Sequence, residues 1–289
     1  MTRLAVPKTY KLFIGGKFPR SESGRSYRVL SRKGAFVANA AQGSRKDARD
    51  AVRAARAAFP GWSGATAYNR GQILYRIAEM LEGRRAQFAD EIQALEGGSA
   101  QAAKRQVDRA IDLWVWYAGW ADKYAQVTGS VNPVAGPYFN LSSPDPTGVV
   151  AIVAPQAGDS LLGLVSVIAP AIVSGNTAVV VADERAPLPA ISLAEVLATS
   201  DLPGGVVNIL SGSPAELAPW LAAHADVNAI DLAGCGGLDW AELERTACDT
   251  VKRVLFPLAD PAAGSAPPSL DRVTALVEIK TVWHTKAVL

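Results

Sequence analysis

Cysteine, histidine and methionine are scarce in this sequence, and each occurs only twice among 289 residues. Two cysteines cannot build a disulfide scaffold, and their scarcity favours a reducing compartment, so we expect a cytoplasmic protein. The four side chains that could bind a metal also lack the C-x-x-C or H-x-x-H spacing of a zinc site. They are Cys235, Cys248, His224 and His284. No metal site is predicted, and the length allows a sizeable core without one.

An uninterrupted apolar segment of membrane-spanning length is also missing. The N-terminus lacks the apolar stretch of a secretory signal peptide. Residues 160–182 carry no charge and are long enough to span a bilayer, but Pro170 and the string Ser174-Gly175-Asn176-Thr177 interrupt them. A buried helix followed by a buried parallel strand explains this segment better, so no membrane partner is expected.

Acidic residues are rare in the first 60 residues. This part carries 14 Lys and Arg against 3 Asp and Glu, a net charge of 14 − 3 = +11, and the remainder carries 15 − 24 = −9. Such asymmetry can mark a nucleic-acid-binding surface. The basic residues are scattered, however, without a run or interleaved aromatic side chains. A solvated face, or a face that docks on an acidic partner subunit, explains the pattern better, and no nucleic-acid partner is expected.

A short strand region at 10–18 precedes a part of the chain with helical periodicity. The predicted helices span 44–59, 67–81, 84–95 and 100–125. The first begins at Ser44, an N-cap with Asp47 three residues later, and ends at Pro60-Gly61. The last carries an aromatic stripe, which could form a ligand cage but at helical spacing is typical of a core or a subunit interface. The stripe consists of Trp114, Trp116, Tyr117, Trp120 and Tyr124.

Strands and helices alternate in the second half of the chain. The predicted strands span 149–154, 177–181, 206–210 and 229–232, and the helices that follow them span 161–173, 187–199, 214–223 and 240–255. Apolar strands that alternate with helices are typical of a parallel sheet with helices on both faces. We therefore predict an α/β fold with a doubly wound parallel sheet. Residues 129–146, with four prolines, indicate an extended hairpin arm, and a last strand is predicted at 275–283.

Six short strings, taken in order, give the chain a family resemblance. They are 11–17 (KLFIGGK), 59–62 (FPGW), 148–155 (GVVAIVAP), 174–177 (SGNT), 202–208 (LPGGVVN) and 277–282 (VEIKTV). On these strings the chain resembles the aldehyde dehydrogenase superfamily over nearly all of its length. The resemblance implies a Rossmann-like nucleotide-binding domain, a catalytic domain and a β oligomerisation arm.

The resemblance also implies how the chain is divided. The nucleotide-binding-like domain is similar to residues 1–126 and 149–257, and the oligomerisation arm to residues 127–148 and 268–289. Residues 258–267 form a Pro-, Ala- and Gly-rich linker at the place where the family has its catalytic domain. The chain therefore resembles a truncated member that lacks the catalytic domain.

The residues that carry the chemistry of this family have no counterparts in the sequence. The family oxidises aldehydes by attack of a Cys thiolate and hydride transfer to NAD(P), but neither cysteine stands in its Gly-Gln-x-Cys setting. The general-base Glu of its Glu-Leu-Gly-Gly string is also missing. The Asn of its oxyanion hole aligns with Ala157, which cannot donate a hydrogen bond, and losing one such donor typically costs about 10²–10³ in rate. We expect no catalytic residue, and we expect His224 and Asp231 to be surface or capping groups.

Cofactor binding is expected to be weak or absent. The Lys-x-x-Glu pair that holds the adenosine ribose in the family aligns with Val181 and Glu184, so only the carboxylate is kept. The Gly-Ser pair near the pyrophosphate aligns with Gly234 and Cys235, where backbone amides could still meet an anion. Glu184, Gly234 and Cys235 are thus candidate remnants of an NAD site. Cys235 could instead be a reactive thiol at a helix N-terminus, but no base accompanies it in sequence.

Two functions follow from these observations. Loss of the catalytic parts beside a retained arm favours a non-catalytic, aldehyde dehydrogenase-like subunit with a structural or regulatory role. Such a subunit would form homo-oligomers, or hetero-oligomers with a full-length aldehyde dehydrogenase, because its last strand needs a partner edge. The alternative is an active NAD(P)-dependent aldehyde dehydrogenase of reduced size.

Overall fold

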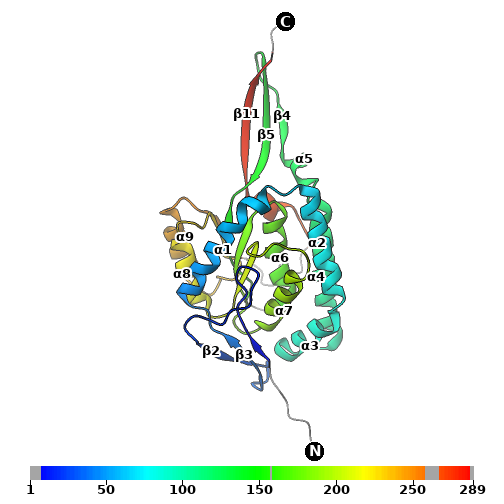
Figure 1. Ribbon diagram of the computed structural model, residues 1–289, viewed down its shortest axis with the longest axis vertical. Helices are drawn as coiled ribbons and strands as arrows, with labels where there is room; N and C mark the ends of the chain where they lie inside the picture. Colours follow the sequence, from blue (N-terminus) through cyan, green and yellow to red (C-terminus); the bar gives the residue numbers. More distant parts are fainter. Residues whose placement is uncertain (1–7, 157, 258–266, 287–289) are drawn as a thin grey trace, which may run out of the picture.

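The computed structural model describes residues 8–156, 158–257 and 267–286, and Figure 1 shows how their helices and strands are arranged. A small sheet of order β1-β3-β2 comes first, built from β1 (Thr9–Tyr10), β2 (Ser26–Leu30) and β3 (Phe36–Ala41). Sequence reasoning did not find β2 and β3, because alanine and serine blur the alternation that marks a half-buried strand.

The helical part follows the predicted order. It comprises α1 (Arg45–Ser63), α2 (Ala67–Glu82), α3 (Arg85–Glu96), α4 (Ala100–Trp120) and α5 (Tyr124–Thr128). The cap of α1 is confirmed, since the Ser44 hydroxyl accepts from the Asp47 N–H and the Asp47 carboxylate accepts from the Ser44 N–H. The predicted end of this helix at Pro60 is wrong: α1 continues to Ser63. There the buried Trp62 indole donates to the Ile172 carbonyl at 2.9 Å, a tertiary contact that stabilises the last turn.

A five-stranded sheet of order β10-β9-β6-β7-β8 forms the centre, and all its neighbours are parallel. The strands are β6 (Val149–Val153), β7 (Thr177–Val181), β8 (Val207–Leu210), β9 (Ala229–Asp231) and β10 (Arg253–Leu255). The helices between them are α6 (Ser160–Val173), α7 (Leu188–Ala198), α8 (Pro214–Ala223) and α9 (Trp240–Cys248). The predicted doubly wound parallel sheet is confirmed.

Two of the predicted helices are too long. The helix expected over 240–255 ends at Cys248, and residues 253–255 form β10 beside β9. Between them Val251 adopts a left-handed backbone conformation with φ 54°, which no helix continues through. The helix expected over 100–125 likewise ends at Trp120, and the chain resumes as the short α5.

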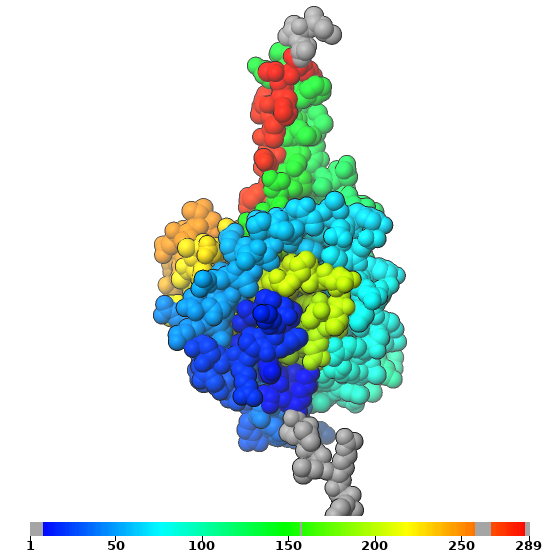
Figure 2. All heavy atoms as spheres, in the orientation of Figure 1, coloured from blue at the N-terminus to red at the C-terminus, as the bar shows by residue number. Residues whose placement is uncertain are grey.

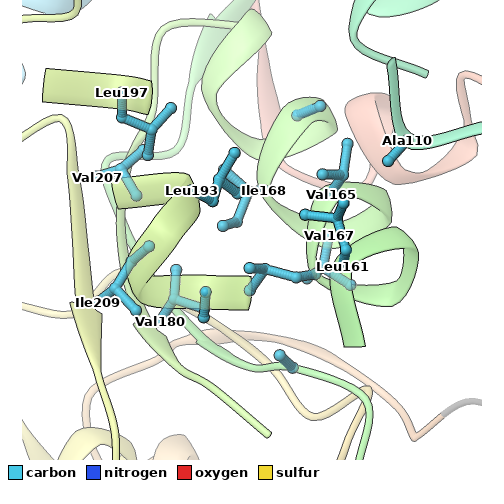
Figure 3. Close-up of a cluster of buried hydrophobic side chains, with 14 of the residues drawn as sticks. Ala110, Leu161, Val165, Val167, Ile168, Val180, Leu193, Leu197, Val207 and Ile209 are labelled. Carbon is cyan, nitrogen blue, oxygen red and sulfur yellow. The ribbon is translucent and has the colours of Figure 1, made fainter. Parts of the chain in front are cut away.

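The central sheet separates two apolar cores. Ala178 and Val180 of β7 face the core formed with α6, α7 and α4, whereas Val179 and Val181 face the core formed with α1, α8 and α9. Figure 3 shows the first core, where α6 and α7 side chains meet those of β7 and β8. The residues of one strand therefore alternate between cores, as the two-residue period of a strand requires.

A three-stranded arm stands clear of this body in Figures 1 and 2. It consists of β4 (Ser130–Asn132), β5 (Tyr138–Pro146) and β11 (Val277–Thr285), in the antiparallel order β11-β5-β4, and α10 (Asp271–Thr274) precedes its last strand. β11 pairs with β5 over nine consecutive residues, which is the pairing the hairpin and the last strand were expected to make. Most of the expected linker, residues 258–266, lies outside the described residues.

One buried side chain fastens the arm to the body. Asn176 lies between α6 and β7, and its Oδ1 accepts from the Gly148 N–H at the junction of β5 and β6, at 2.8 Å. Its Nδ2 donates at 2.8 Å to the carbonyl of Leu276, the residue before β11. A single amide therefore holds both long strands of the arm at their base.

Candidate functional site

The carboxyl ends of the parallel strands are where an open α/β sheet binds its ligands. In this chain the loops after β6, β7 and β9 lie at that edge, and the strand order reverses between β6 and β9. Two of the candidate residues, Gly234 and Cys235, follow β9, and the third, Glu184, follows β7. All three thus lie at the expected edge of the sheet.

Val181, which stands where the resemblance places a lysine, is part of the core. Its side chain is fully buried, in the same apolar cluster as Leu210 and Leu243. Valine therefore packs into the core at this position and offers no hydrogen-bond donor.

Cys235 belongs to the same apolar cluster and is fully buried. Burial first, and the nearby Asp231 carboxylate second, raise the pKa of its thiol to about 12. The thiol is therefore protonated near neutral pH, which is the opposite of a reactive cysteine. It also does not begin a helix: α9 begins at Trp240, and its first turn is capped by Asp239, which accepts from the Glu242 N–H at 3.1 Å.

Gly234 is held tightly against the loop after β6. A Cβ atom at this position would lie 1.9 Å from the carbonyl oxygen of Ala154, so that no larger residue fits without movement of the backbone. The Gly234 N–H is already used, since it donates to the Val153 carbonyl at 2.9 Å. Glycine at this position thus allows the loops after β6 and β9 to lie close together where the strand order reverses.

Glu184 is exposed and lines a cleft of about 1100 Å³. The cleft lies between the loops after β6 and β7, strand β2 and the turn at Gly97-Gly98. Gln156 lines the cleft and connects the loops after β6 and β7. Its Nε2 donates to the Ala154 carbonyl at 2.7 Å, and its Oε1 accepts from the Glu184 N–H at 3.0 Å. Glu184 therefore lines a cleft whose walls do not include Gly234 or Cys235, and the structure does not bring the three candidates into one cleft.

Charged residues of both signs line this cleft: the acidic Glu96, Asp159, Asp183 and Glu184, and the basic Arg28, Arg32 and Arg185. Asp183 is buried, and burial raises the pKa of its carboxyl even though the Arg185 and Ala186 N–H groups donate to it. Burial also raises the pKa of Asp159, with the neighbouring Glu96 carboxylate as the second cause.

Asp231 lies in a different environment from the one that the sequence predicts. It was expected at the surface or in a cap, but it is fully buried at the end of β9. Arg272 of α10 pairs with its carboxylate, and the Ala233 N–H donates to it at 3.0 Å. No local pattern predicts this pair, because its partners lie 41 residues apart on either side of the linker. His224 does cap as expected, with its Nδ1 accepting from the Asp226 N–H.

The two cysteines of the chain lie in different environments. Cys235 is buried and protonated, while the other cysteine, Cys248, is exposed in the last turn of α9. Ala157, which aligns with the oxyanion-hole Asn, lies outside the described residues. Within those residues no group of three His, Cys, Asp or Glu side chains could hold a metal ion.

Comparison with known proteins agrees with this architecture. Residues 19–256 match the model of the aldehyde dehydrogenase family. The chain belongs to the aldehyde dehydrogenase family. Among its relatives, cytosolic 10-formyltetrahydrofolate dehydrogenase of Mus musculus is 32% identical over 263 residues, which cover 89% of this chain and 29% of the relative. Benzaldehyde dehydrogenase of Antirrhinum majus is 32% identical over 86% of this chain and 46% of its own length.

Solved structures of the family share the fold. HpcC from Thermus thermophilus superimposes with a TM-score of 0.79 at 31% identity, over 86% of this chain and 47% of that one. An aldehyde dehydrogenase from Bacillus cereus, solved as an NAD+ complex, gives 0.79 at 25% identity, over 86% and 50%. The chain thus spans about half the length of the family members that it matches, or less.

The uncharged segment at 160–182 forms α6, a turn and β7, as the sequence predicted. Among the described residues no helix is both long and apolar enough to cross a bilayer.

Proposed function

We propose that this chain is a non-catalytic member of the aldehyde dehydrogenase family whose role, structural or regulatory, lies in assembly. It forms oligomers through its arm, with copies of itself or with a full-length aldehyde dehydrogenase, in the cytoplasm. Residues 1–126 and 149–257 act as a nucleotide-binding-like body, 127–148 and 268–289 as the arm, and 258–267 as the linker in place of a catalytic domain. The observation that carries this proposal is the burial of Val181 and Cys235 in one apolar core cluster.

The contacts around the candidate NAD residues support this proposal. At three of the four family positions the side chain or the backbone is engaged in packing: Val181 and Cys235 in the core, and Gly234 against Ala154. The exposed Glu184 remains, but without the lysine of the family pair its carboxylate alone is left to hold the adenosine ribose. Hence NAD binds weakly or not at all, and no hydride acceptor is held for aldehyde oxidation.

The arm supports the proposed role in assembly. Its strands keep full pairing and a buried anchor at Asn176, yet large apolar side chains are exposed on it. Val131 is 67% exposed, Phe139 55% and Trp283 59%. Exposed apolar groups of this size on a projecting element mark an interaction site.

Calorimetric titration with NAD and NADP, together with an NADH assay on several aldehydes, tests the proposal against the active-enzyme alternative. A ligand at 100 times its Kd stabilises a protein by about 2.7 kcal/mol, so thermal unfolding with 1 mM NAD also reports binding. We expect no heat, no shift of Tm and no NADH. A full-length aldehyde dehydrogenase treated in the same way is the positive control. Micromolar affinity for either nucleotide, or NADH formed above background, would contradict the proposal.

A further inference from the structure

β11 is an edge strand that the described chain leaves open. It is the outermost strand of the arm, nine residues long, and its register with β5 runs without a bulge. Ile279 and Trp283 are 54% and 59% exposed on it. A long, regular and apolar edge exposes a row of unpaired backbone N–H and C=O groups, and such edges pair with another strand.

Two of the devices that usually prevent edge pairing, proline and a bulge, are missing from β11. Edges are commonly protected by proline, by bulges or by charged side chains that repel a neighbour. β11 contains no proline, and its two charged residues are already paired within the chain. Glu278 binds Arg253 at 2.7 Å, and Lys280 lies 3.8 Å from Asp145 of the adjacent β5. The open edge is therefore available for pairing.

The backbone hydrogen bonds show which residues of β11 face outward. The Lys286 N–H donates to the Pro137 carbonyl, and the Leu276 carbonyl accepts from the Thr147 N–H, so the even-numbered residues bond toward β5. In an antiparallel pair, hydrogen-bonded and non-bonded positions alternate. The odd-numbered residues, from Val277 to Thr285, therefore direct their N–H and C=O groups to the open edge.

We propose that the edge of β11 pairs with β11 of a second copy of this chain, antiparallel, with Thr281 on the two-fold axis. This proposal rests on the proposed role in assembly and names its partner. The register overlaps all nine residues and matches odd-numbered residues with odd-numbered ones, which gives roughly ten interchain hydrogen bonds. It forms one six-stranded sheet from the two arms.

The side chains fit this register on both faces of the joined sheet. Ile279 lies opposite Trp283 of the second copy, and the two-fold axis repeats this apolar pair. On the other face Glu278 lies opposite His284 of the second copy, so that no like charges meet. A second copy thus covers the two most exposed apolar side chains of β11.

A cysteine on the axis tests the register directly. In a hydrogen-bonded antiparallel pair the Cα atoms are about 5.5 Å apart, which is within the range of a disulfide. In a background with Cys248→Ser, which removes the exposed native thiol, Thr281→Cys should give a disulfide-linked dimer under mild oxidation. Ser143→Cys in the same background is the matched control, because it is exposed on the inner strand β5 and should stay unlinked.

A proline at the same position tests the pairing itself. Thr281→Pro removes an outward N–H that β5 does not use, so the arm keeps its backbone hydrogen bonds and loses only the exposed contact between the Thr281 and Ser142 hydroxyls. Light scattering should show a dimer for the unmodified chain and a monomer for Thr281→Pro, with unchanged far-UV circular dichroism and thermal unfolding.

Three results would overturn the inference in different ways. A dimer that persists in Thr281→Pro and gives no disulfide with Thr281→Cys refutes this edge while leaving assembly intact. A monomer that binds a purified full-length aldehyde dehydrogenase from the same organism refutes self-pairing but keeps the proposed function. A monomer that binds neither partner refutes both.

Discussion

Val181 and Cys235 are single residues whose side chains are buried in the core and therefore contact neither ligand nor solvent. Both stand where the family resemblance places nucleotide contacts, and both lie in one apolar cluster between the sheet and α1, α8 and α9. Valine adds packing there instead of charge, and the cysteine thiol stays protonated because burial raises its pKa. Replacing one of them by the residue that the family has there is therefore expected to change the stability of the fold rather than the affinity for NAD.

Replacing Val181 by Lys should destabilise the fold without creating NAD affinity. Burial disfavours an ammonium and lowers its pKa, and a depression of about two units costs about 3 kcal/mol near pH 7. Because the folded pKa lies below the unfolded value of about 10.4, this loss is full below the folded pKa, shrinks as the pH rises from there, and is gone above the unfolded value. Urea unfolding at pH 7 and pH 10 measures it, with Val181→Met as the neutral control. Unchanged stability, or stabilisation by NAD, would refute this expectation.

Removing the cation from the buried pair Asp231–Arg272 should be costly in a pH-dependent way. Arg272→Met leaves a buried carboxylate without its partner, which typically costs about 3–5 kcal/mol. Burial already raises the pKa of Asp231, and without the guanidinium the pKa rises further. An acid whose folded pKa is raised binds a proton on folding at low pH, so the deficit of the variant should be smaller at pH 5 than at pH 8.

Urea unfolding of the unmodified chain and the variant at both pH values checks this prediction. Asp231→Asn combined with Arg272→Met is the control, since it removes the charge together with its partner and should recover part of the loss. A deficit that is the same at pH 5 and pH 8 would show that the carboxyl does not titrate in the folded variant.

Helix α6 shows at the scale of elements how side chains complete a helix end. Its last carbonyls have no partner within the helix and must be satisfied from elsewhere. The Ile172 carbonyl accepts from Trp62 of α1, that of Val173 from Arg70 of α2, and that of Ser174 from Tyr124 of α5. Three helices are thus attached to the C-terminal end of α6, next to the base of the arm.

Asn176→Ala should loosen the arm at its base. The change removes the acceptor of the Gly148 N–H, which is left buried without a partner, and one of two donors to the Leu276 carbonyl, which keeps the Thr147 N–H. A buried N–H without a partner costs about 1–3 kcal/mol, and a loss of this size is expected. Hydrogen exchange should speed up in β5 and β11 more than in β7. Asn69→Ala, an exposed asparagine on α2, is the matched control and should change neither. Equal exchange in the arm of both variants would contradict the anchoring role.

At the scale of the whole molecule the arm and the body are separable at Val277. Val273, Leu276 and Val277 are buried in the body core, whereas the rest of β11 is exposed or half-buried. A truncation that removes residues 278–289 therefore spares the core, while one from 270 onward also removes Arg272 and exposes Asp231. The longer truncation cannot distinguish loss of assembly from loss of the fold.

Deleting residues 278–289 should give a monomer whose body remains folded. β5 then becomes the edge and loses its partner over most of its length. Light scattering measures the mass, and urea unfolding should show a cooperative transition of the body close to that of the full chain. The deletion from residue 270 serves as the comparison and should unfold at lower urea. An oligomer of unchanged size after the shorter deletion would place assembly on another surface.

The sequence alone determined the elements whose signals are local. Apolar strands such as 177–181 and the cap at Ser44 are specified by neighbours within a few residues, and their alternation is sufficient to predict a parallel sheet. The six residue strings were likewise sufficient to identify the family. Strand β10 was missed because its three residues become a strand only through their pairing with β9.

The tertiary structure alone decided what depends on burial and on distant partners. Whether Val181 reaches solvent, whether the Cys235 thiol ionises and which charge meets Asp231 follow from atoms far away in the sequence. The same holds for Asn176, whose amide joins residues 148 and 276. Desolvation and long-range hydrogen bonds act between residues that no local pattern links, so they become visible only when the chain is folded.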